Sequence, residues 1–165
     1  MITKWNFQTP TEEELHKRDR LASQLGLSPV VCLLLVQRGL TTVEEVKKFF
    51  KPSLNDLHDP FLMPDMEKAV KRLNKALGNK EKILIYGDYD VDGTTAVSLV
   101  YKYLRPYSSA LDYYIPDRYD EGYGISYKGI NYARENGITL VISLDCGIKA
   151  IEKIEYAKQL GIDFI

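Results

Sequence analysis

The spacing of apolar residues changes near Lys80, and the two sides of that point predict different architectures. Before Lys80, apolar residues recur at helical spacing, and capping-box patterns that begin at Thr11 and Thr42 mark two helix starts. Another helix is expected to begin at Pro29, because proline suits the first turn of a helix. A fourth is expected after Asp65, which is a residue type that caps helices.

After Lys80, short apolar runs alternate with amphipathic segments. The alternating segments are 83–86, 94–104, 111–115, 126–135, 139–144, 149–160 and 162–165. This order predicts a βαβαβαβ chain, and its crossovers require a parallel sheet with helices on both faces. The fold class is therefore α/β, and ligand sites in such sheets lie beyond the carboxyl ends of the strands.

These patterns predict two parts. Residues 1–79 form a helical leader, in which the stretch 52–64, with its three prolines, is an extended connector. Residues 80–165 form the first part of an α/β domain. The chain stops inside the fourth predicted strand, before the crossover that a core strand needs, so we expect a piece of a longer protein.

Composition limits the classes of partner. The chain has 22 Lys and Arg against 23 Asp and Glu, so no overall positive field drives non-specific capture of nucleic acid or an anionic membrane. No apolar run approaches the roughly 18 residues of a membrane span, and no signal-peptide pattern is present. The two cysteines, Cys32 and Cys146, lack metal-type spacing and favour a reducing compartment. We expect a cytoplasmic protein without a membrane partner.

The strongest chemical signal is a cluster of aspartates. Asp88, Asp90 and Asp92 occupy alternate positions directly after the first predicted strand, and Asp145 ends the third. Two like charges about 4 Å apart repel by roughly 4 kcal/mol at an effective dielectric constant near 20, so the cluster requires a bound cation or a raised pKa. Carboxylate oxygens favour Mg²⁺ or Mn²⁺.

Two other site types share part of this pattern. An EF-hand loop starting at Asp88 would need a bidentate Glu at its twelfth position, where Leu99 stands. The residues from Asp90 to Thr94 also resemble the signature of haloacid-dehalogenase-type phosphatases, with Asp90 as the nucleophile. That nucleophile would follow its strand directly, whereas residues 87–89 intervene here. The phosphatase interpretation stays open as an alternative.

Three separated motifs carry a family resemblance: Ile85-Tyr86-Gly87-Asp88-Tyr89-Asp90-Val91-Asp92-Gly93, then Ile115-Pro116-Asp117-Arg118 with Glu121-Gly122-Tyr123-Gly124, and Leu144-Asp145-Cys146-Gly147. Together they resemble the DHH phosphoesterase superfamily, and within it the RecJ-type single-strand-specific 5′ to 3′ exonucleases. The similarity continues into the leader at 59–62 and 66–73. It implies an enzyme of DNA repair and recombination that acts on single-stranded DNA, with other repair proteins as partners.

The resemblance also implies a metal site and its ligands. It implies phosphodiester hydrolysis by paired Mn²⁺ or Mg²⁺ ions, with Asp90 and Asp92 as first-motif ligands and Asp145 as the second-motif ligand, all three catalytic. Asp88 matches an auxiliary metal ligand less closely. Tyr86 stands where many small relatives carry a histidine ligand, which puts the metal stoichiometry in question.

The tyrosine-rich middle of the chain suggests contacts with nucleic acid. Aromatic side chains stack on bases and cations follow phosphates in single-strand binding. Arg118 is our candidate for binding a terminal phosphate, because a guanidinium can be bidentate, and Tyr123 is our candidate for contacting a base.

The motif that names the family, Asp-His-His, does not occur in this sequence. We therefore expect residues 1–165 alone to bind a single ion weakly and to show no nuclease activity. A catalytically silent DHH-type nucleic-acid-binding module is the remaining alternative.

Overall fold

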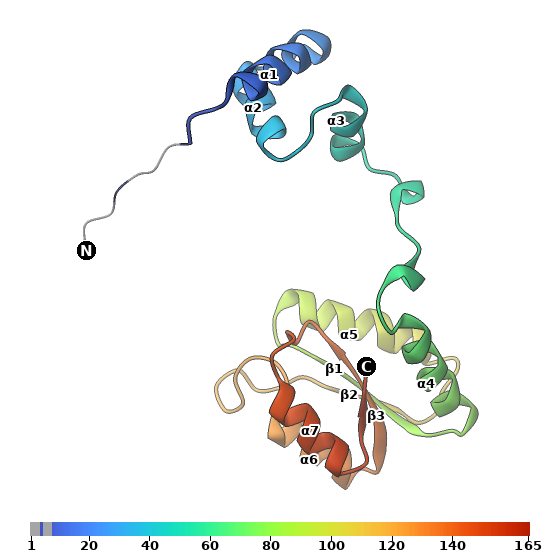
Figure 1. Ribbon diagram of the computed structural model, residues 1–165. Helices are drawn as coiled ribbons and strands as arrows, with labels where there is room; N and C mark the ends of the chain where they lie inside the picture. The colour runs from blue at the N-terminus through green and yellow to red at the C-terminus, as the bar shows by residue number, and fades with distance from the viewer. Residues whose placement is uncertain (1–3, 5–7) are drawn as a thin grey trace. The chain divides into compact units, whose positions relative to one another are not determined.

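Two units make up the chain in the computed structural model, Met1–Asp59 and Pro60–Ile165, and the structure describes residue 4 and residues 8–165 (Figure 1). The first unit contains α1 (Glu12–Leu25), α2 (Pro29–Gln37) and α3 (Val43–Phe50). Both predicted capping boxes are confirmed, since Thr11 and Thr42 each accept the expected backbone N–H at 3.2 Å.

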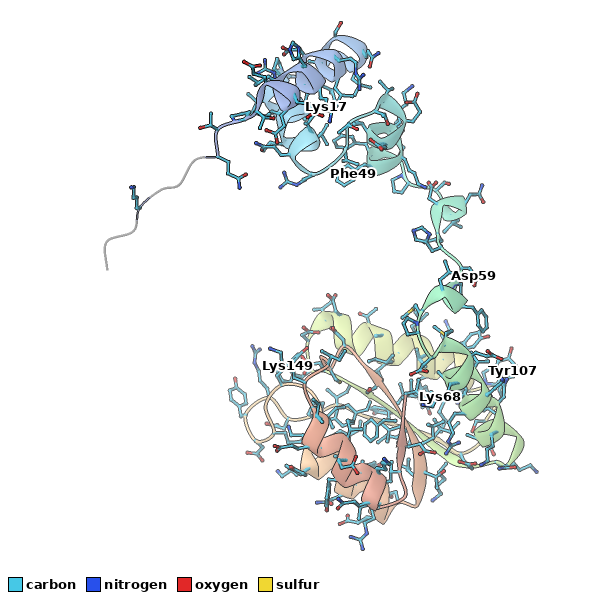
Figure 2. The ribbon with its side chains drawn as sticks, viewed as in Figure 1. Lys17, Phe49, Asp59, Lys68, Tyr107 and Lys149 are labelled. Atoms are coloured by element: carbon cyan, nitrogen blue, oxygen red, sulfur yellow. The ribbon has the colours of Figure 1, made fainter. Side chains whose placement is uncertain are left out.

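The core of the first unit is small. Among its described residues, the buried side chains of this core are Leu21, Cys32, Leu35, Val36 and Val46. Other apolar side chains remain exposed, including Phe49 on α3, which Figure 2 labels.

The predicted connector contains two short 3₁₀ turns, η1 (Leu54–Asp56) and η2 (Pro60–Leu62), which the sequence pattern did not predict. The carboxylate of Asp56 accepts the Ser53 N–H at 2.8 Å, which stabilises the first turn.

Helix α4 (Met66–Gly78) belongs to the second unit. Its side chains Leu73, Ala76 and Leu77 pack against the sheet, which explains why this unit begins at Pro60 and includes a helix that the sequence pattern grouped with the leader. Asp65 precedes the helix in a left-handed conformation and makes no capping hydrogen bond, so the expectation that its side chain caps α4 is wrong.

The rest of the second unit is a parallel sheet in the order β2-β1-β3-β4. Its strands are β1 (Lys82–Gly87), β2 (Leu111–Tyr114), β3 (Ile138–Leu144) and β4 (Asp163–Phe164), and its crossover helices are α5 (Val91–Leu104), α6 (Tyr127–Glu135) and α7 (Ile151–Gln159). The predicted α/β class is confirmed.

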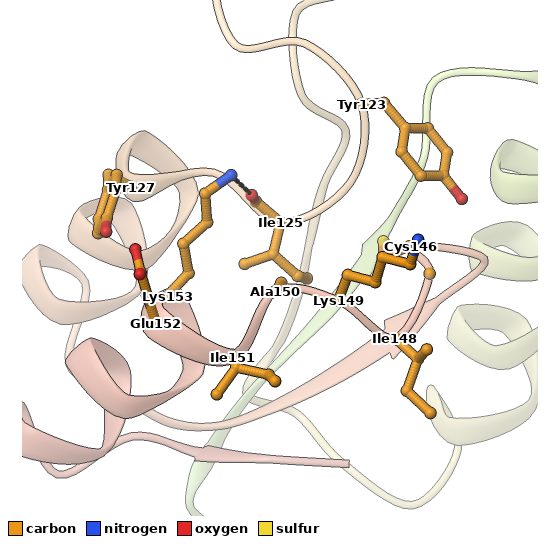
Figure 3. A pocket seen from close by; sticks show the side chains of 11 residues that line it. Tyr123, Ile125, Tyr127, Cys146, Ile148, Lys149, Ala150, Ile151, Glu152 and Lys153 are labelled. Atoms are coloured by element: carbon orange, nitrogen blue, oxygen red, sulfur yellow. Dashed lines mark hydrogen bonds between the residues drawn. The ribbon is translucent and has the colours of Figure 1, made fainter.

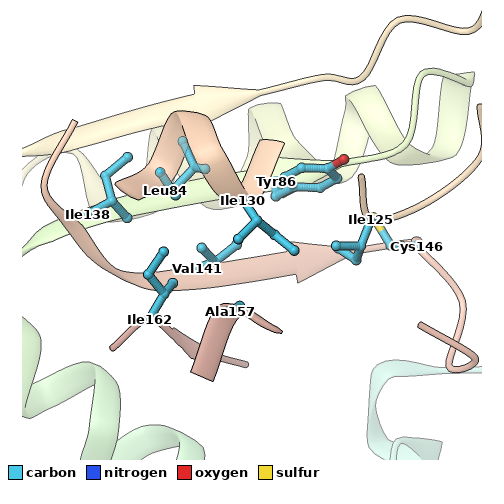
Figure 4. Close-up of a cluster of buried hydrophobic side chains, with 10 residues drawn as sticks. Leu84, Tyr86, Ile125, Ile130, Ile138, Val141, Cys146, Ala157 and Ile162 are labelled. Carbon is cyan, nitrogen blue, oxygen red and sulfur yellow. The ribbon is translucent and has the colours of Figure 1, made fainter. Parts of the chain in front are cut away.

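Helices cover both faces of the sheet. On β1, Ile83 and Ile85 pack toward α4 and α5, whereas Leu84 and Tyr86 pack toward α6 and α7 (Figures 1 and 4). Burial on both faces explains why the strands read as nearly continuous apolar runs. In the part of the chain that the structure describes, no helix combines the length and the hydropathy needed to cross a bilayer.

Candidate metal centre

The predicted aspartates follow the ends of two neighbouring strands, at the point where the sheet reverses its strand order. β1 and β3 are neighbours, with Gly87 opposite Leu144, so Asp88 and Asp145 directly follow adjacent strand ends. The chain leaves β1 toward α5 on one face of the sheet and leaves β3 toward α7 on the other face (Figure 1). Diverging loops at such a switch point form the crevice in which α/β proteins bind ligands. We call Asp88, Asp90, Asp92 and Asp145 the aspartate rim.

Asp88 is the buried member of the aspartate rim, with 1% of its surface exposed. Its Oδ1 accepts the N–H of Gly124 at 3.3 Å, and its Oδ2 is buried without a hydrogen-bond partner among the described residues. A buried carboxylate oxygen without a partner carries a large desolvation penalty. A bound cation would remove that penalty.

Asp90 and Asp92 are placed by the start of α5. The helix begins at Val91, one turn earlier than predicted, and Asp90 is its N-cap, with Oδ1 accepting the Gly93 N–H at 2.9 Å. Asp92 lies in the first turn, and both carboxylates are exposed. Only glycine fits at position 93, because a Cβ there would lie 2.4 Å from the Asp88 carbonyl oxygen.

Asp145 stands on the opposite side of the crevice, in the left-handed region with a φ of 56°. Its carbonyl accepts the hydroxyl of Tyr123 at 3.3 Å. Partial burial raises the pKa of Tyr123, and the charges of Asp145, Asp88 and Asp90 raise it further. One phenol thus experiences the charges of three rim carboxylates.

Cys146 follows Asp145 and is buried. Burial, and after it the charge of Asp88, raises the pKa of this thiol to about 11, so it is protonated at neutral pH. Its side chain packs in the core cluster on the α6 and α7 face. These observations make Cys146 a packing residue.

The donor set of the aspartate rim suits Mg²⁺ or Mn²⁺. All four side chains offer carboxylate oxygens, and the Oδ2 of Asp88 has no hydrogen-bond partner among the described residues. Among residue 4 and residues 8–165, however, no three His, Cys, Asp or Glu side chains are arranged to enclose an ion. The described residues therefore offer part of a coordination shell.

A buried hydrogen-bond network, which the sequence did not predict, holds the loop between β2 and α6. The Tyr86 hydroxyl donates to the Gly124 carbonyl at 3.0 Å and accepts the Ser126 N–H at 3.1 Å, and burial raises the pKa of Tyr86 to about 12. Glu121 accepts from the hydroxyls of Tyr114 and Ser126. Tyr86 therefore positions this loop, and its hydroxyl is committed to backbone groups.

Arg118 is exposed in the same loop, and its guanidinium carbon lies 5.1 Å from the centre of the Tyr89 ring. Tyr89 comes from the loop after β1, so this contact connects the loops that follow β1 and β2. Sequence reasoning did not single out Tyr89, because a tyrosine between two aspartates carries no signal of its partner.

Comparison with known proteins identifies the family. The model of the DHH family, N-terminal domain, matches residues 82–165. The single-stranded-DNA-specific exonuclease RecJ of Bacillus subtilis is 40% identical over 98% of this chain and 20% of its own length, and RecJ of Escherichia coli is 32% identical over 84% of this chain and 24% of its own length. The chain thus spans about a fifth to a quarter of these relatives.

Solved structures agree. A crystal structure of exonuclease RecJ bound to manganese matches 62% of this chain and 27% of its own length, with a TM-score of 0.56 and 28% identity. RecJ from Thermus thermophilus, in complex with Mn²⁺, matches 91% of this chain and 20% of its own length, with a TM-score of 0.62 and 21% identity, and supports the fold. These findings confirm the resemblance deduced from the motifs. The chain belongs to the DHH family.

Proposed function

We propose that the aspartate rim is one wall of the active site of a RecJ-type exonuclease, which hydrolyses phosphodiester bonds in single-stranded DNA from the 5′ end with Mn²⁺ or Mg²⁺. The observation that carries this proposal is the buried, unpartnered Oδ2 of Asp88 at the switch point of a DHH-family sheet. The relatives named as single-stranded-DNA-specific exonucleases, and their manganese-bound structures, support it.

The aspartates are assigned roles by their positions. Asp90, Asp92 and Asp145 are the proposed catalytic metal ligands, and Asp88 contributes its unpartnered oxygen to the same site. Two bound ions would activate a water molecule and neutralise charge on the scissile phosphate. The Oδ1 of Asp90 accepts the capping hydrogen bond of α5, so its Oδ2 is the oxygen available to a metal ion.

Arg118 and Tyr123 are the proposed nucleic-acid contacts. The exposed guanidinium of Arg118 can bind a 5′-phosphate through two parallel hydrogen bonds, while the Tyr89 ring supports it. Tyr123 is half exposed beside Asp145, where its ring can stack on a base.

The metal-site assignment is tested in the whole gene-encoded polypeptide, as distinct from residues 1–165 alone. Asp145→Asn and Asp90→Asn should each reduce kcat for nucleotide release from single-stranded DNA by about a hundredfold or more, because each removes a ligand of the metal ions that would stabilise transition-state charge. Asp65→Asn, at an exposed position outside the site, is the control. Wild-type rates in both rim variants would disprove the assignment, and an aspartyl-phosphate trapped on Asp90 would support the phosphatase alternative.

The phosphate-binding role of Arg118 has its own test. Arg118→Ala should weaken the binding of 5′-phosphorylated DNA ends more than that of unphosphorylated ends, since only the former place two negative charges on the guanidinium. Fluorescence anisotropy in Ca²⁺ would measure both affinities. Equal weakening of the two would exclude a phosphate clamp.

For residues 1–165 alone we propose weak binding of a single ion and no turnover, because the described residues offer only part of a coordination shell. Calorimetric titration with Mn²⁺, together with incubation of labelled single-stranded DNA, would measure both properties. Robust release that disappears in Asp90→Asn would contradict this expectation. No release from the gene-encoded polypeptide would instead favour the silent nucleic-acid-binding module.

The cellular setting is a further part of the proposal. Cys32 and Cys146 are free and buried, which suits the reducing cytoplasm. Other repair proteins are the proposed partners there, because single-stranded DNA ends arise as intermediates of repair and recombination.

A further inference from the structure

A cavity of about 770 Å³ adjoins the aspartate rim on the α7 side. One wall consists of Tyr123, Ile125 and Tyr127, and the other consists of residues 146–153, from the loop after β3 and the first turn of α7 (Figure 3). The cavity begins at Cys146, the residue that follows Asp145. Its volume lies in the range of ligand-binding pockets.

Apolar and aromatic side chains make up most of the lining of this cavity. Ile148 is 92% exposed and Ile151 is 76% exposed, although both are large aliphatic residues. Tyr123 and Tyr127 also present much of their rings to solvent. The rings of Tyr127 and Tyr156 pack edge to face, with 5.4 Å between the ring centres, so the Tyr127 ring is held in place.

The charged side chains that line the cavity are two lysines, Lys149 and Lys153, and one carboxylate, Glu152. The carboxylates of Asp88, Asp90 and Asp145 lie outside it, near the lining residue Tyr123. Lys153 donates to the Ile125 carbonyl at 2.5 Å and lies 5.9 Å from the centre of the Tyr127 ring. Lysine Nζ atoms therefore lie next to a largely apolar space, an arrangement that fits a flat ring attached to a phosphate backbone.

We propose that this cavity receives one nucleobase of a single-stranded nucleic acid whose backbone phosphate lies at the aspartate rim. The inference rests on the proposed function, since that function places the phosphate. Every base has a π-face and can make stacking and apolar contacts, so the cavity would bind one base of any identity.

The test compares oligothymidylates that are intact with ones that lack a single base at successive positions from the 5′ end. Affinity is measured by fluorescence anisotropy in Ca²⁺ with the gene-encoded polypeptide. We expect one position to be sensitive, with loss of its base weakening binding about fivefold or more. In the double variant Ile148→Ser with Ile151→Ser, intact DNA should bind as weakly as the abasic DNA, and the sensitivity should disappear.

Leu99→Ser is the matched control, because Leu99 is an aliphatic residue of α5 that is 69% exposed and lies outside the cavity. Uniform sensitivity at all positions, or a double variant that keeps the wild-type preference, would overturn the inference and leave the cavity to another ligand, such as an apolar protein segment. Position-specific binding without metal-dependent release would refute the proposed function alone, whereas release without position sensitivity would refute only this inference.

Discussion

Replacing Tyr86 with phenylalanine tests whether this phenol holds the loop between β2 and α6 against the end of β1. Tyr86 is 1% exposed, and its hydroxyl bonds to the Gly124 carbonyl at 3.0 Å and the Ser126 N–H at 3.1 Å. Phenylalanine keeps the ring that stacks on Tyr114, with 5.3 Å between ring centres. The substitution therefore removes one oxygen atom and little packing.

The expected loss follows from the groups that stay behind. A buried donor and a buried acceptor lose their partner, and an unsatisfied buried polar group costs about 1–3 kcal/mol. Since the loop can relax in part, we expect the free energy of unfolding to fall by about 2 kcal/mol. Urea denaturation followed by circular dichroism would measure this as a lower midpoint at an unchanged m-value.

Tyr103→Phe is the control for this experiment, because Tyr103 is 66% exposed and its change should stay within about 0.5 kcal/mol. Gly124 also donates to Asp88, so Tyr86→Phe should weaken Mn²⁺ binding to the folded protein as well. A variant of Tyr86 that matches the control in both measurements would refute the role of the hydroxyl.

Two further predictions concern stability. Gly93→Ala should destabilise the protein by more than about 2 kcal/mol in urea denaturation, because the new Cβ would lie 2.4 Å from the Asp88 carbonyl oxygen. Gly78→Ala is the control and should stabilise the protein by about 0.5 kcal/mol, because a Cβ there would have nothing within 4 Å. Equal effects of the two substitutions would contradict this packing. Hydrogen bonds from the Thr139 hydroxyl and then Arg72 lower the pKa of Glu81 below 4.5, so its stabilisation is present above pH 4.5 and is lost as the pH falls through the folded-state pKa. Glu81→Gln should therefore flatten the acid dependence of the melting temperature, and an unchanged profile would show that Glu81 does not carry it.

Much of the fold could be predicted because its signals are local. Capping boxes and apolar spacing predict the helices of the leader, and alternating runs predict the parallel sheet. Helix α5 begins at Val91, before the predicted segment 94–104, and so includes Gly93. The missing side chain of Gly93 admits the backbone of Asp88, a contact that propensity does not encode.

For the candidate site, the sequence was sufficient to predict which strand ends carry the aspartates. That Asp88 and Asp145 share an edge follows from parallel strands alone. The burial of Asp88, the commitment of the Tyr86 hydroxyl and the stacking of Arg118 on Tyr89 were not predictable, because each depends on the path of the loop between β2 and α6. Side-chain types and their spacing do not specify such a path.

The sheet topology explains why that loop is the part that completes the candidate site. β2 lies on one side of β1 and β3 on the other, so the chain must pass the end of β1 on its way to α6. Gly124 lies on this path, with its N–H on Asp88 and its Cα so close to the Cys146 carbonyl that a Cβ would stand 2.8 Å away. One loop thus touches the carboxyl ends of both central strands. Substitutions that loosen it should alter the geometry of Asp88 and Asp145 together, even though these residues are far apart in sequence.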